Sequence, residues 1–426
     1  MAVVSPLRGL RYNEEKVGPL SHVVAPPYDV IGHEDAERLR ARHPNNVIRL
    51  ILGECPEGAC RPDAEYRQAA DALTQWTDDG ILRRDEEPSV YVCEQEFSVR
   101  GTTYTRRGFV ARVLLEDLAR GSIYPHEETT PGPKADRLQL MRACRANLSH
   151  IFALYPGGRD DVAPLLDGMA CGAPDAQASD EEGVVSRMWR TSDAGLIDRL
   201  SKAMADKPLF IADGHHRYET ALAYRDQVAG AAGADHVLMT CVAMDDPGLV
   251  ILPAHRLVRH SPSAGGDLTE ALSAEFDVTP HDGDLTRLME KLAVLTPRQA
   301  FGMIRRGDGP CVVALRSEAV LDEAMPDRSP AWRRLDVSVL QSRILEGLLG
   351  LDLARVKEEG VVAYVKSEAE AERRVASGEY EVAFLMNATR IEQVQEIAAA
   401  REKMPPKSTY FYPKLLSGLV INPLAD

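Results

Sequence analysis

The sequence predicts a mixed α/β protein, with a central domain between an N-terminal extension and a C-terminal α/β domain. Apolar runs of strand length alternate with segments whose apolar residues recur at helical spacing, which is the pattern of mixed structure. The chain has 426 residues, too many for one ordinary hydrophobic core, which favours two or three domains. We place the parts at 1–118, 119–260 and 261–426, with a polar tail at 404–416 that packs back against the central site.

The N-terminal part is expected to contain one helix and one β-hairpin. Within residues 63–79, apolar residues such as Leu73 and Trp76 recur at helical spacing. Two β-rich runs, 89–99 and 103–113, are separated by Arg100-Gly101-Thr102, which is typical of a hairpin turn.

The central and C-terminal parts alternate between helical and extended patterns. In the central part we expect a variable surface insertion with one short helix at 156–182, and helices and strands at 135–147, 195–205, 209–222, 236–243 and 249–257. In the C-terminal part, elements are expected at 267–275, 284–295, 300–305, 311–315, 336–349, 361–365, 367–377, 381–386 and 390–403.

Composition excludes several classes of protein. The net charge is -15, from 65 acidic and 50 basic side chains, which disfavours nucleic-acid binding. The sequence contains neither an apolar run long enough for a membrane helix nor a secretory leader, so we expect a cytoplasmic protein with no membrane partner. The seven scattered cysteines do not form a disulfide framework, and Cys55 and Cys60 lack the further ligands of a zinc site.

The strongest local signal is a junction between a predicted strand and a predicted helix, Leu209 to Leu222. Between them stands Asp213-Gly214-His215-His216-Arg217. Glycine permits a close or left-handed backbone, the amide groups of a helix N-terminus attract anions, and arginine offers a planar set of donors. The pattern predicts a phosphate or carboxylate site, and a purely structural turn is the alternative interpretation.

Polar and proline-rich strings along the chain carry a resemblance to a known family. These strings are Leu10-Arg11-Tyr12-Asn13, Ala25-Pro26-Pro27-Tyr28-Asp29-Val30-Ile31, Asn45-Asn46-Val47-Ile48-Arg49-Leu50, Pro125-His126-Glu127-Glu128-Thr129 and Met404-Pro405-Pro406-Lys407-Ser408-Thr409-Tyr410-Phe411-Tyr412-Pro413-Lys414. On them, almost the whole chain resembles the domain-of-unknown-function family 1015 (DUF1015) of bacteria and archaea. That family name carries no reaction, so function has to be argued from the site.

The segment from Asp213 to Ala221 also resembles the second box of the ParB/sulfiredoxin superfamily. There a strand leads into a Gly-x-x-Arg turn and a helix with a small residue four positions after the arginine, which is Ala221 here. In that superfamily the turn binds nucleotide phosphates or a protein substrate. Residues 123–130 match the first box, and the resemblance implies that the two boxes meet in space.

The free-serine kinases of this superfamily use a glutamate of the first box as the general base. The resemblance implies that Glu127 or Glu128 has this role here. It further implies positive charge from Arg217, Lys134 and Arg137. Asp213 would contact Mg²⁺ or a histidine, and the phosphate donor would be a nucleotide: ATP, ADP or CTP. Phosphoryl transfer needs positioning, charge neutralisation and a carboxylate to take the hydroxyl proton.

Further residues complete the predicted site. His215 and His216 cannot readily chelate one metal ion, because neighbours on a helix point about 100° apart, so we expect them to donate hydrogen bonds; a phosphohistidine relay is a weaker alternative. A loop that closes the pocket is expected at Pro26, Pro27, Tyr28 and Asp29. The remaining candidate phosphate ligands are Gly214, His126, Thr129, Lys407, Ser408, Thr409 and Lys414.

The function that these residues favour is nucleotide-dependent transfer of a phosphoryl group to a small hydroxyl metabolite, with L-serine as the first candidate. The expected partners are therefore a nucleotide and a small-molecule substrate. Three alternatives stay open: a nucleotide-binding regulatory module without turnover, a phosphatase that uses water as acceptor, and a DNA-partition protein, which the charge disfavours.

Overall fold

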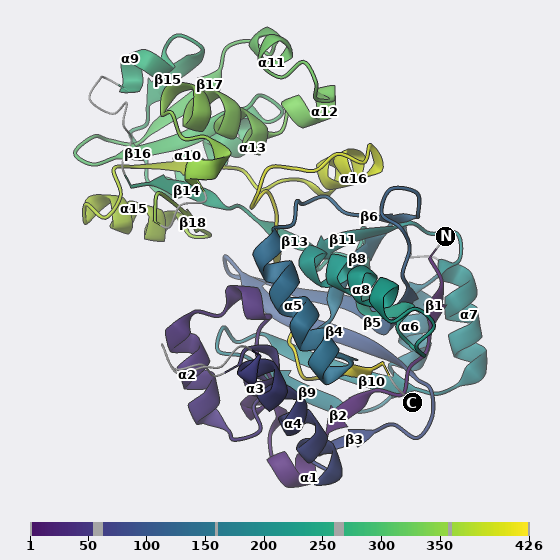
Figure 1. Cartoon of the computed structure of the whole chain (residues 1–426). Helices are drawn as coiled ribbons and strands as arrows, with labels where there is room; N and C mark the ends of the chain where they lie inside the picture. Colours follow the sequence, from purple (N-terminus) through teal and green to yellow (C-terminus); the bar gives the residue numbers. More distant parts are fainter. Residues whose placement is uncertain (1, 54–62, 158–160, 260–267, 357–359, 425–426) are drawn as a thin grey trace. The chain divides into compact units, whose positions relative to one another are not determined.

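The computed structural model describes residues 2–53, 63–157, 161–259, 268–356 and 360–424, which form two compact units (Figure 1). Unit 1 comprises Met1–Pro125, Thr129–Val250 and Pro413–Asp426, and unit 2 comprises His126–Glu128 and Ile251–Tyr412. This division replaces the predicted boundaries near 118 and 260. The reason is that the hairpin of the predicted N-terminal extension pairs with strands of the predicted central domain in one sheet.

Among the described residues of unit 1, nine strands form one sheet in the order β6-β11-β8-β12-β5-β4-β10-β9, with β1 paired to β5. The β11–β6 and β12–β8 pairs are parallel and the other pairs are antiparallel. The strands are β1 (Val4–Ser5), β4 (Val90–Val99), β5 (Thr102–Leu114), β6 (Ile123–Tyr124), β8 (Ile151–Tyr155), β9 (Ala176–Ser179), β10 (Val185–Thr191), β11 (Leu209–Asp213) and β12 (His236–Ala243). Two small ladders pair β2 (Leu10–Tyr12) with β3 (Leu82–Arg84) and β7 (Ala146–Asn147) with β21 (Asn422–Pro423).

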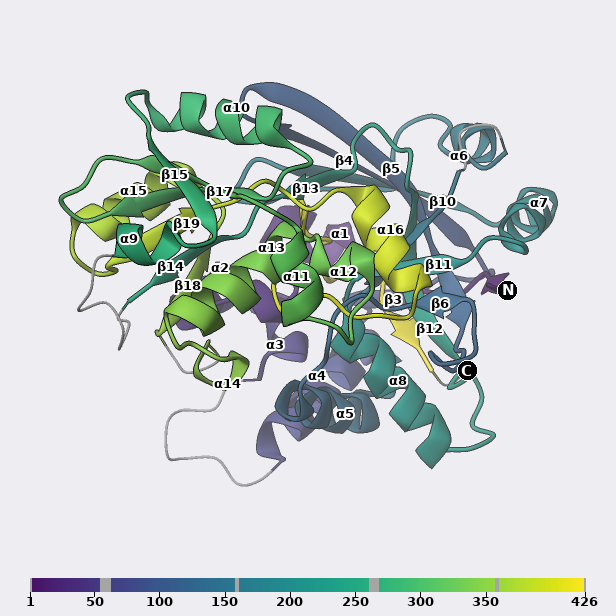
Figure 2. The same ribbon diagram turned by 90° about the horizontal axis from the view of Figure 1, so that it is seen from above.

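Helices cover the sheet of unit 1 on both faces, because side chains along a strand alternate between the two sides. Tyr91 and Val110 belong to a core shared with α2, α3 and α4, whereas Val92 and Phe109 belong to a core shared with α6, α7 and α8. Helices α5 and α8 lie side by side (Figure 2). The helices are α1 (Glu14–Val17), η1 (Leu20–His22), η2 (Tyr28–Val30), α2 (His33–Arg42), α3 (Ile48–Ile51), α4 (Ala64–Asp78), α5 (Pro131–Cys144), α6 (Ala163–Met169), α7 (Ala194–Met204) and α8 (His215–Gln227).

Most predicted elements of unit 1 occur at or near their predicted positions. The hairpin β4–β5 and the helix α4 are confirmed, and β12 has the predicted bounds. The helix predicted at 135–147 begins earlier, at Pro131, since proline fits the first turn of a helix, and it ends at Cys144. The insertion predicted at 156–182 contributes more than a short helix, because β9 forms an edge of the sheet.

Unit 2 contains a sheet in the order β15-β17-β16-β19-β14-β18, whose described pairs are all antiparallel. The strands are β14 (His255–Val258), β15 (Phe276–Pro280), β16 (Ala300–Arg305), β17 (Cys311–Leu315), β18 (Val362–Val365) and β19 (Val382–Leu385), and β13 (Val250–Leu252) pairs separately with β20 (Tyr410–Tyr412). The helices are α9 (Leu268–Leu272), α10 (Leu285–Leu295), α11 (Ala319–Ala324), α12 (Pro330–Arg333), α13 (Asp336–Val339), η3 (Leu340–Leu348), α14 (Leu353–Val356), α15 (Glu368–Ala376) and α16 (Ile391–Ala399).

Three predicted elements of unit 2 differ from the structure. The strand predicted at 249–257 is divided into β13 and β14 at Pro253, which has no amide hydrogen for a ladder. The helix predicted at 336–349 is α-helical only to Val339 and continues as the π-helical η3. The helix predicted at 390–403 ends at Ala399, and Arg401 adopts a left-handed backbone two residues later.

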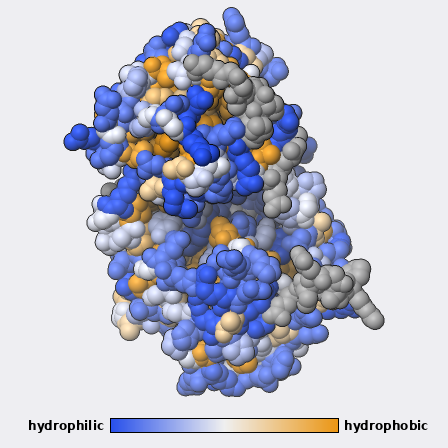
Figure 3. All heavy atoms as spheres, turned by 90° about the vertical axis from the view of Figure 1, so that its left-hand side faces the viewer, coloured by the Kyte–Doolittle hydropathy of each residue, from blue (hydrophilic) through white to orange (hydrophobic). Residues whose placement is uncertain are grey.

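The face of the protein shown in Figure 3 is largely hydrophilic, and apolar residues appear on it in small groups. Within the described ranges, none of the helices combines the length and the apolar character that crossing a membrane requires.

Candidate functional site

The predicted strand–turn–helix junction is formed by β11 and α8. The residues Leu209 to Ala212 are buried, and the register of β11 against β8 shifts between Ile211 and Asp213. Gly214 follows in the left-handed region, with φ 91° and ψ 28°, and it precedes the first turn of α8. A Cβ atom on Gly214 would lie 3.0 Å from Cζ of Arg217. The left-handed backbone therefore favours glycine here, and any Cβ atom at this position would displace the neighbouring guanidinium.

Asp213 holds two cationic side chains at once. Its Oδ2 accepts a hydrogen bond from Arg217 at 2.6 Å, and its Oδ1 accepts one from Nζ of Lys414. All three side chains are 12–14% exposed. Burial alone would raise the pKa of Asp213, but the charges of Lys414 and Arg217 outweigh it and hold that pKa well below its usual range. Two cations share one carboxylate, so this triad carries a net charge of about +1 at neutral pH.

The backbone carbonyl of His150 fixes the other side of Arg217 by accepting a hydrogen bond from its guanidinium. The imidazole of His150 is buried between Thr240 Oγ1, 2.8 Å from Nδ1, and the carbonyl of Val420, 3.0 Å from Nε2. Since a carbonyl only accepts, Nε2 carries the proton and Nδ1 accepts from Thr240. Burial lowers the pKa of His150 to about 4, so the ring is neutral at pH 7.

Lys414 reaches the site on the C-terminal segment, which threads through unit 1. Arg106 donates to the carbonyl of Pro413 at 2.6 Å, and Gln95 donates to that of Lys414 at 3.1 Å. The guanidinium of Arg106 is buried, and its carbon lies 4.7 Å from the ring centre of Phe152. These contacts on both sides of Lys414 hold its ammonium against Asp213.

The start of α5 is tied to the first turns of α8. The amide of Thr130 donates to Nε2 of His216 at 3.0 Å, so that nitrogen is unprotonated in this arrangement. The carboxylate of Glu219 accepts from Thr129 Oγ1 at 2.7 Å and from Lys134 Nζ at 2.9 Å. Lys134, predicted as a phosphate ligand, is therefore held in an ion pair in this arrangement.

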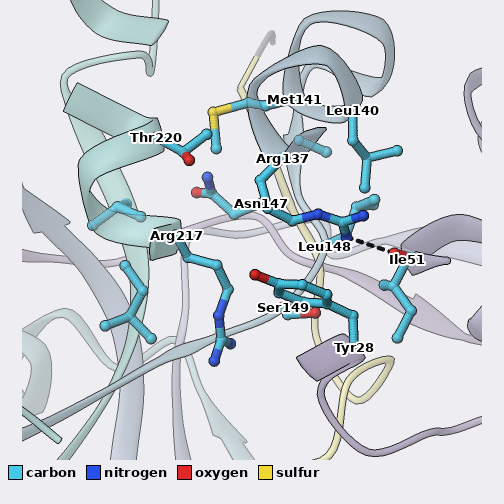
Figure 4. Close-up of a pocket in the computed structure, with 13 residues that line it drawn as sticks. Tyr28, Ile51, Arg137, Leu140, Met141, Asn147, Leu148, Ser149, Arg217 and Thr220 are labelled. Carbon is cyan, nitrogen blue, oxygen red and sulfur yellow. Dashed lines mark hydrogen bonds between the residues drawn. The ribbon is translucent and has the colours of Figure 1, made fainter. Parts of the chain in front are cut away.

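A pocket between α5 and α8 brings Tyr28, Arg137 and Arg217 together (Figure 4). The guanidinium carbon of Arg137 lies 4.1 Å from the ring centre of Tyr28, which is a cation–π geometry. Arg137 also donates to Asp136 at 2.6 Å and to the carbonyl of Ile51 at 2.5 Å. Tyr28, from the predicted pocket loop, thus lines a pocket with two of the predicted cations. Pro27 stands at the start of η2, and Pro26 and Asp29 flank these residues.

The remaining candidate residues belong to unit 2, where the structure brings several of them together. Nε2 of the buried His126 lies 2.9 Å from Oγ1 of Thr409, and Glu127 forms a parallel β-bridge with Met404. The hydroxyl of Ser408 donates to a backbone carbonyl, and the carbonyl of Lys407 accepts from a buried arginine at 3.0 Å. Glu128 belongs to the same short segment.

The comparisons with known proteins identify the family. A family model described as "Protein of unknown function (DUF1015)" matches residues 4–338. The chain belongs to the DUF1015 family. A search of curated proteins found no match to this DUF1015 protein.

Among solved structures, the DUF1015 chain is similar to a free serine kinase in complex with AMP, at 15% identity and TM-score 0.34, over 69% of this chain and 86% of that one. A conserved hypothetical protein from Pyrococcus furiosus has 15% identity and TM-score 0.34, over 69% and 90% of the two chains. A C-terminally truncated SbnI from Staphylococcus aureus has 11% identity and TM-score 0.36, over 71% and 84%. At these values the likeness carries no argument about function, which rests on the residues of this chain.

The arrangement around Asp213 does not fit a magnesium ligand, because both carboxylate oxygens are engaged by cations. Within the described ranges, no group of three or more histidine, cysteine, aspartate or glutamate side chains is placed to hold a metal ion. Cys55 and Cys60 lie outside the described residues.

Several residues of the site were not predicted from the sequence of this DUF1015 protein. Glu219 follows His216 by three positions and therefore shares its helix face, which is a signal that sequence inspection could have used. His150, Asn147 and Thr220 have no comparable signal, because their contacts depend on the pairing of distant strands and on helix packing.

Proposed function

We propose that this DUF1015 protein transfers a phosphoryl group from a nucleotide to the hydroxyl group of a small metabolite, with L-serine as the first acceptor to test. The observation that supports the proposal most is the triad of Asp213, Arg217 and Lys414 at the start of α8. The triad holds two cations against one carboxylate, so that it carries a net positive charge. The N-terminal amides of a helix add to the attraction for phosphate.

Each residue of the junction has a role in this proposal. Gly214, with its left-handed backbone, makes the turn between Asp213 and α8 and leaves room beside it for the guanidinium of Arg217. Arg217 and Lys414 offset the charge that phosphate oxygens carry in the transition state, and Asp213 keeps both in place. His215, next to the turn, is a candidate hydrogen-bond donor.

The chemistry also requires a base for the acceptor hydroxyl. A new bond forms between the acceptor oxygen and the terminal phosphorus, the bond from that phosphorus to its bridging oxygen breaks, and the hydroxyl proton goes to a carboxylate. The resemblance of residues 123–130 to the first ParB/sulfiredoxin box assigns this carboxylate to Glu127, with Glu128 as the alternative. In the same assignment His126, Thr129, Lys407, Ser408 and Thr409 are candidate phosphate ligands.

Two substitutions separate binding from turnover. Arg217→Met should weaken nucleotide binding about ten- to hundredfold, which corresponds to the loss of charge-assisted hydrogen bonds. Glu127→Gln should keep the nucleotide Kd within about twofold and reduce turnover by about 100-fold or more. Arg142→Met, which removes an exposed cation that contacts Gln227, is the control for Arg217. Glu128→Gln tests the alternative assignment of the base, since turnover should fall in this variant instead if Glu128 takes the proton.

The assay is calorimetric titration with ATP, ADP and CTP, combined with phosphorus NMR of reaction mixtures that contain Mg²⁺ and a panel of hydroxyl metabolites. Unchanged binding and turnover in both the Arg217 and the Glu127 variants would refute the site assignment. Binding without conversion would instead identify a regulatory module. Release of inorganic phosphate that needs no acceptor would identify a phosphatase.

A further inference from the structure

The pocket between α5 and α8 contains a buried hydroxyl group without a partner. Thr220, in α8, is 1% exposed and lines the pocket together with Arg217 (Figure 4). Across the described parts of the chain, its Oγ1 has no hydrogen-bond partner. A threonine inside a helix commonly donates to the carbonyl four residues earlier, and this one does not. A buried polar group that lacks a partner destabilises the protein that carries it.

The neighbours of Thr220 show what kind of group would satisfy it. Thr220 follows Arg217 by three positions, which places both on one face of α8. Across the pocket, the amide oxygen of Asn147 accepts from the amide of Leu238 at 3.1 Å and from Asn422 at 2.8 Å. This use of the oxygen leaves the NH₂ end of Asn147 to serve as a donor toward a bound molecule.

Charge and size restrict the class of ligand. Arg137 is balanced by Asp136, whereas Arg217 belongs to the triad with excess positive charge, so the pocket favours one negative charge. Its volume of about 50 Å³ corresponds to roughly two water molecules at about 30 Å³ each. This space accommodates the enclosed part of a three- or four-carbon compound and is too small for a nucleoside.

We propose that this pocket binds a small hydroxy acid or amino acid, with its carboxylate at Arg217 and a polar group hydrogen-bonded to Thr220 Oγ1. The inference rests on the proposed function in one respect, namely that the bound acid is the phosphoryl acceptor. Arg217 then lies between the acceptor's carboxylate in the pocket and the phosphates at the N-terminus of α8, and its five N–H donors allow it to contact both.

Substitution of Thr220 by valine tests the proposal, since valine keeps the branched shape and removes the hydroxyl. Binding of L-serine, D-glycerate and L-lactate would be measured by saturation-transfer NMR and calorimetry without any nucleotide, and glycerol and AMP serve as probes that lack the carboxylate. Thr220→Val should weaken binding of the acids about three- to tenfold, as expected for one hydrogen bond. Thr220→Ser retains the hydroxyl and should stay within about twofold of the parent.

Thermal unfolding of the unliganded protein is a second test, because it measures whether the hydroxyl of Thr220 contributes to stability. Thr220→Val should leave Tm unchanged or raise it, because the lost hydroxyl made no hydrogen bond. Thr240→Val is the matched control: its buried hydroxyl contacts His150 at 2.8 Å, so its removal should lower Tm. A decrease in Tm for Thr220→Val as large as that for Thr240→Val would overturn the proposal, because the hydroxyl would then be structural.

The binding and transfer assays separate this inference from the proposed function. Acids that bind and depend on Thr220 in a protein that transfers no phosphate would support the pocket and refute the phosphotransferase. Phosphoryl transfer with an unchanged KM for the acceptor in Thr220→Val would refute the pocket and support the phosphotransferase. Failure of all three acids to bind the parent protein, or a loss of AMP binding alone in Thr220→Val, would also overturn the pocket assignment.

Discussion

Replacing Asp213 with asparagine should destabilise unit 1 strongly, because it leaves Arg217 and Lys414 side by side without their shared carboxylate. Both cations contact Asp213, and all three side chains are 12–14% exposed. Removing one partner of a buried ion pair costs about 3–5 kcal/mol. We therefore expect Asp213→Asn to lower the free energy of unfolding by about 3 kcal/mol, the lower end of that range, because the triad retains some exposure.

A double-mutant cycle isolates the interaction. Lys414→Met alone leaves Asp213 paired with Arg217, so the expected loss is smaller, about 1–2 kcal/mol. In the double variant only Arg217 remains charged, and the repulsion that Asp213→Asn creates is removed. We expect the double variant to be more stable than the sum of the single changes predicts, by about 1–3 kcal/mol.

The assay is urea unfolding at pH 7 in a buffer without phosphate. Trp76 and Trp189 lie in unit 1 and report on it by fluorescence, and a Trp332→Phe background removes the signal of unit 2. Additive effects of the two substitutions, or no loss of stability in Asp213→Asn, would refute the reasoning about the triad.

The same variants also test whether the triad binds inorganic phosphate. The net charge of the triad is +1 in the parent, +2 in Asp213→Asn and zero in Lys414→Met. Millimolar phosphate should therefore raise the urea midpoint most in Asp213→Asn and least in Lys414→Met, since a ligand that binds only the folded state stabilises it. Equal stabilisation of all three proteins would show that phosphate binds elsewhere.

Two further predictions concern residues that lie next to Arg217. The pKa of His150 is about 4 in the folded protein, below the value of about 6.5 in the unfolded chain. Because the unfolded state therefore takes up the proton first, the free energy of unfolding should fall by at most about 3 kcal/mol as the pH drops from about 6.5 to about 4. His150→Gln should flatten the dependence of the unfolding free energy on pH in that window, and an unchanged slope would assign the dependence to other groups. Gly214→Ala should lower the free energy of unfolding by about 1–2 kcal/mol and weaken phosphate binding, because alanine is strained at a φ of 91° and its Cβ meets Arg217. Wild-type stability and wild-type phosphate affinity in this variant would contradict the assigned role of Gly214.

The local part of the site was accessible from the sequence. An apolar strand, an Asp-Gly turn and a helix start predict β11, Gly214 and α8, and each depends mainly on neighbouring residues. The hairpin β4–β5 was accessible for the same reason. The five-residue apolar strand β8 was not predicted, since a run of that length carries little periodicity.

Long-range features were less accessible because nothing local encodes them. Asp213 and Lys414 are 201 residues apart, and their contact requires the C-terminal segment to run through unit 1. The grouping of the hairpin with β12 in one sheet depends on non-local strand pairing, which is why the predicted domain boundaries differ from the two units. Likewise, a threonine that lacks a partner, such as Thr220, is indistinguishable in sequence from one that donates along its helix.

Phosphorus NMR of the purified protein tests the central claim most directly, with Mg²⁺, each of ATP, ADP and CTP in turn, and L-serine or another hydroxyl metabolite as acceptor. We expect a new phosphomonoester resonance that requires the acceptor and disappears in Arg217→Met. Spectra in which every nucleotide remains intact with every acceptor, from a protein that also gains no stability from nucleotide or phosphate, would contradict the assignment of a phosphotransferase site at Asp213 to Arg217.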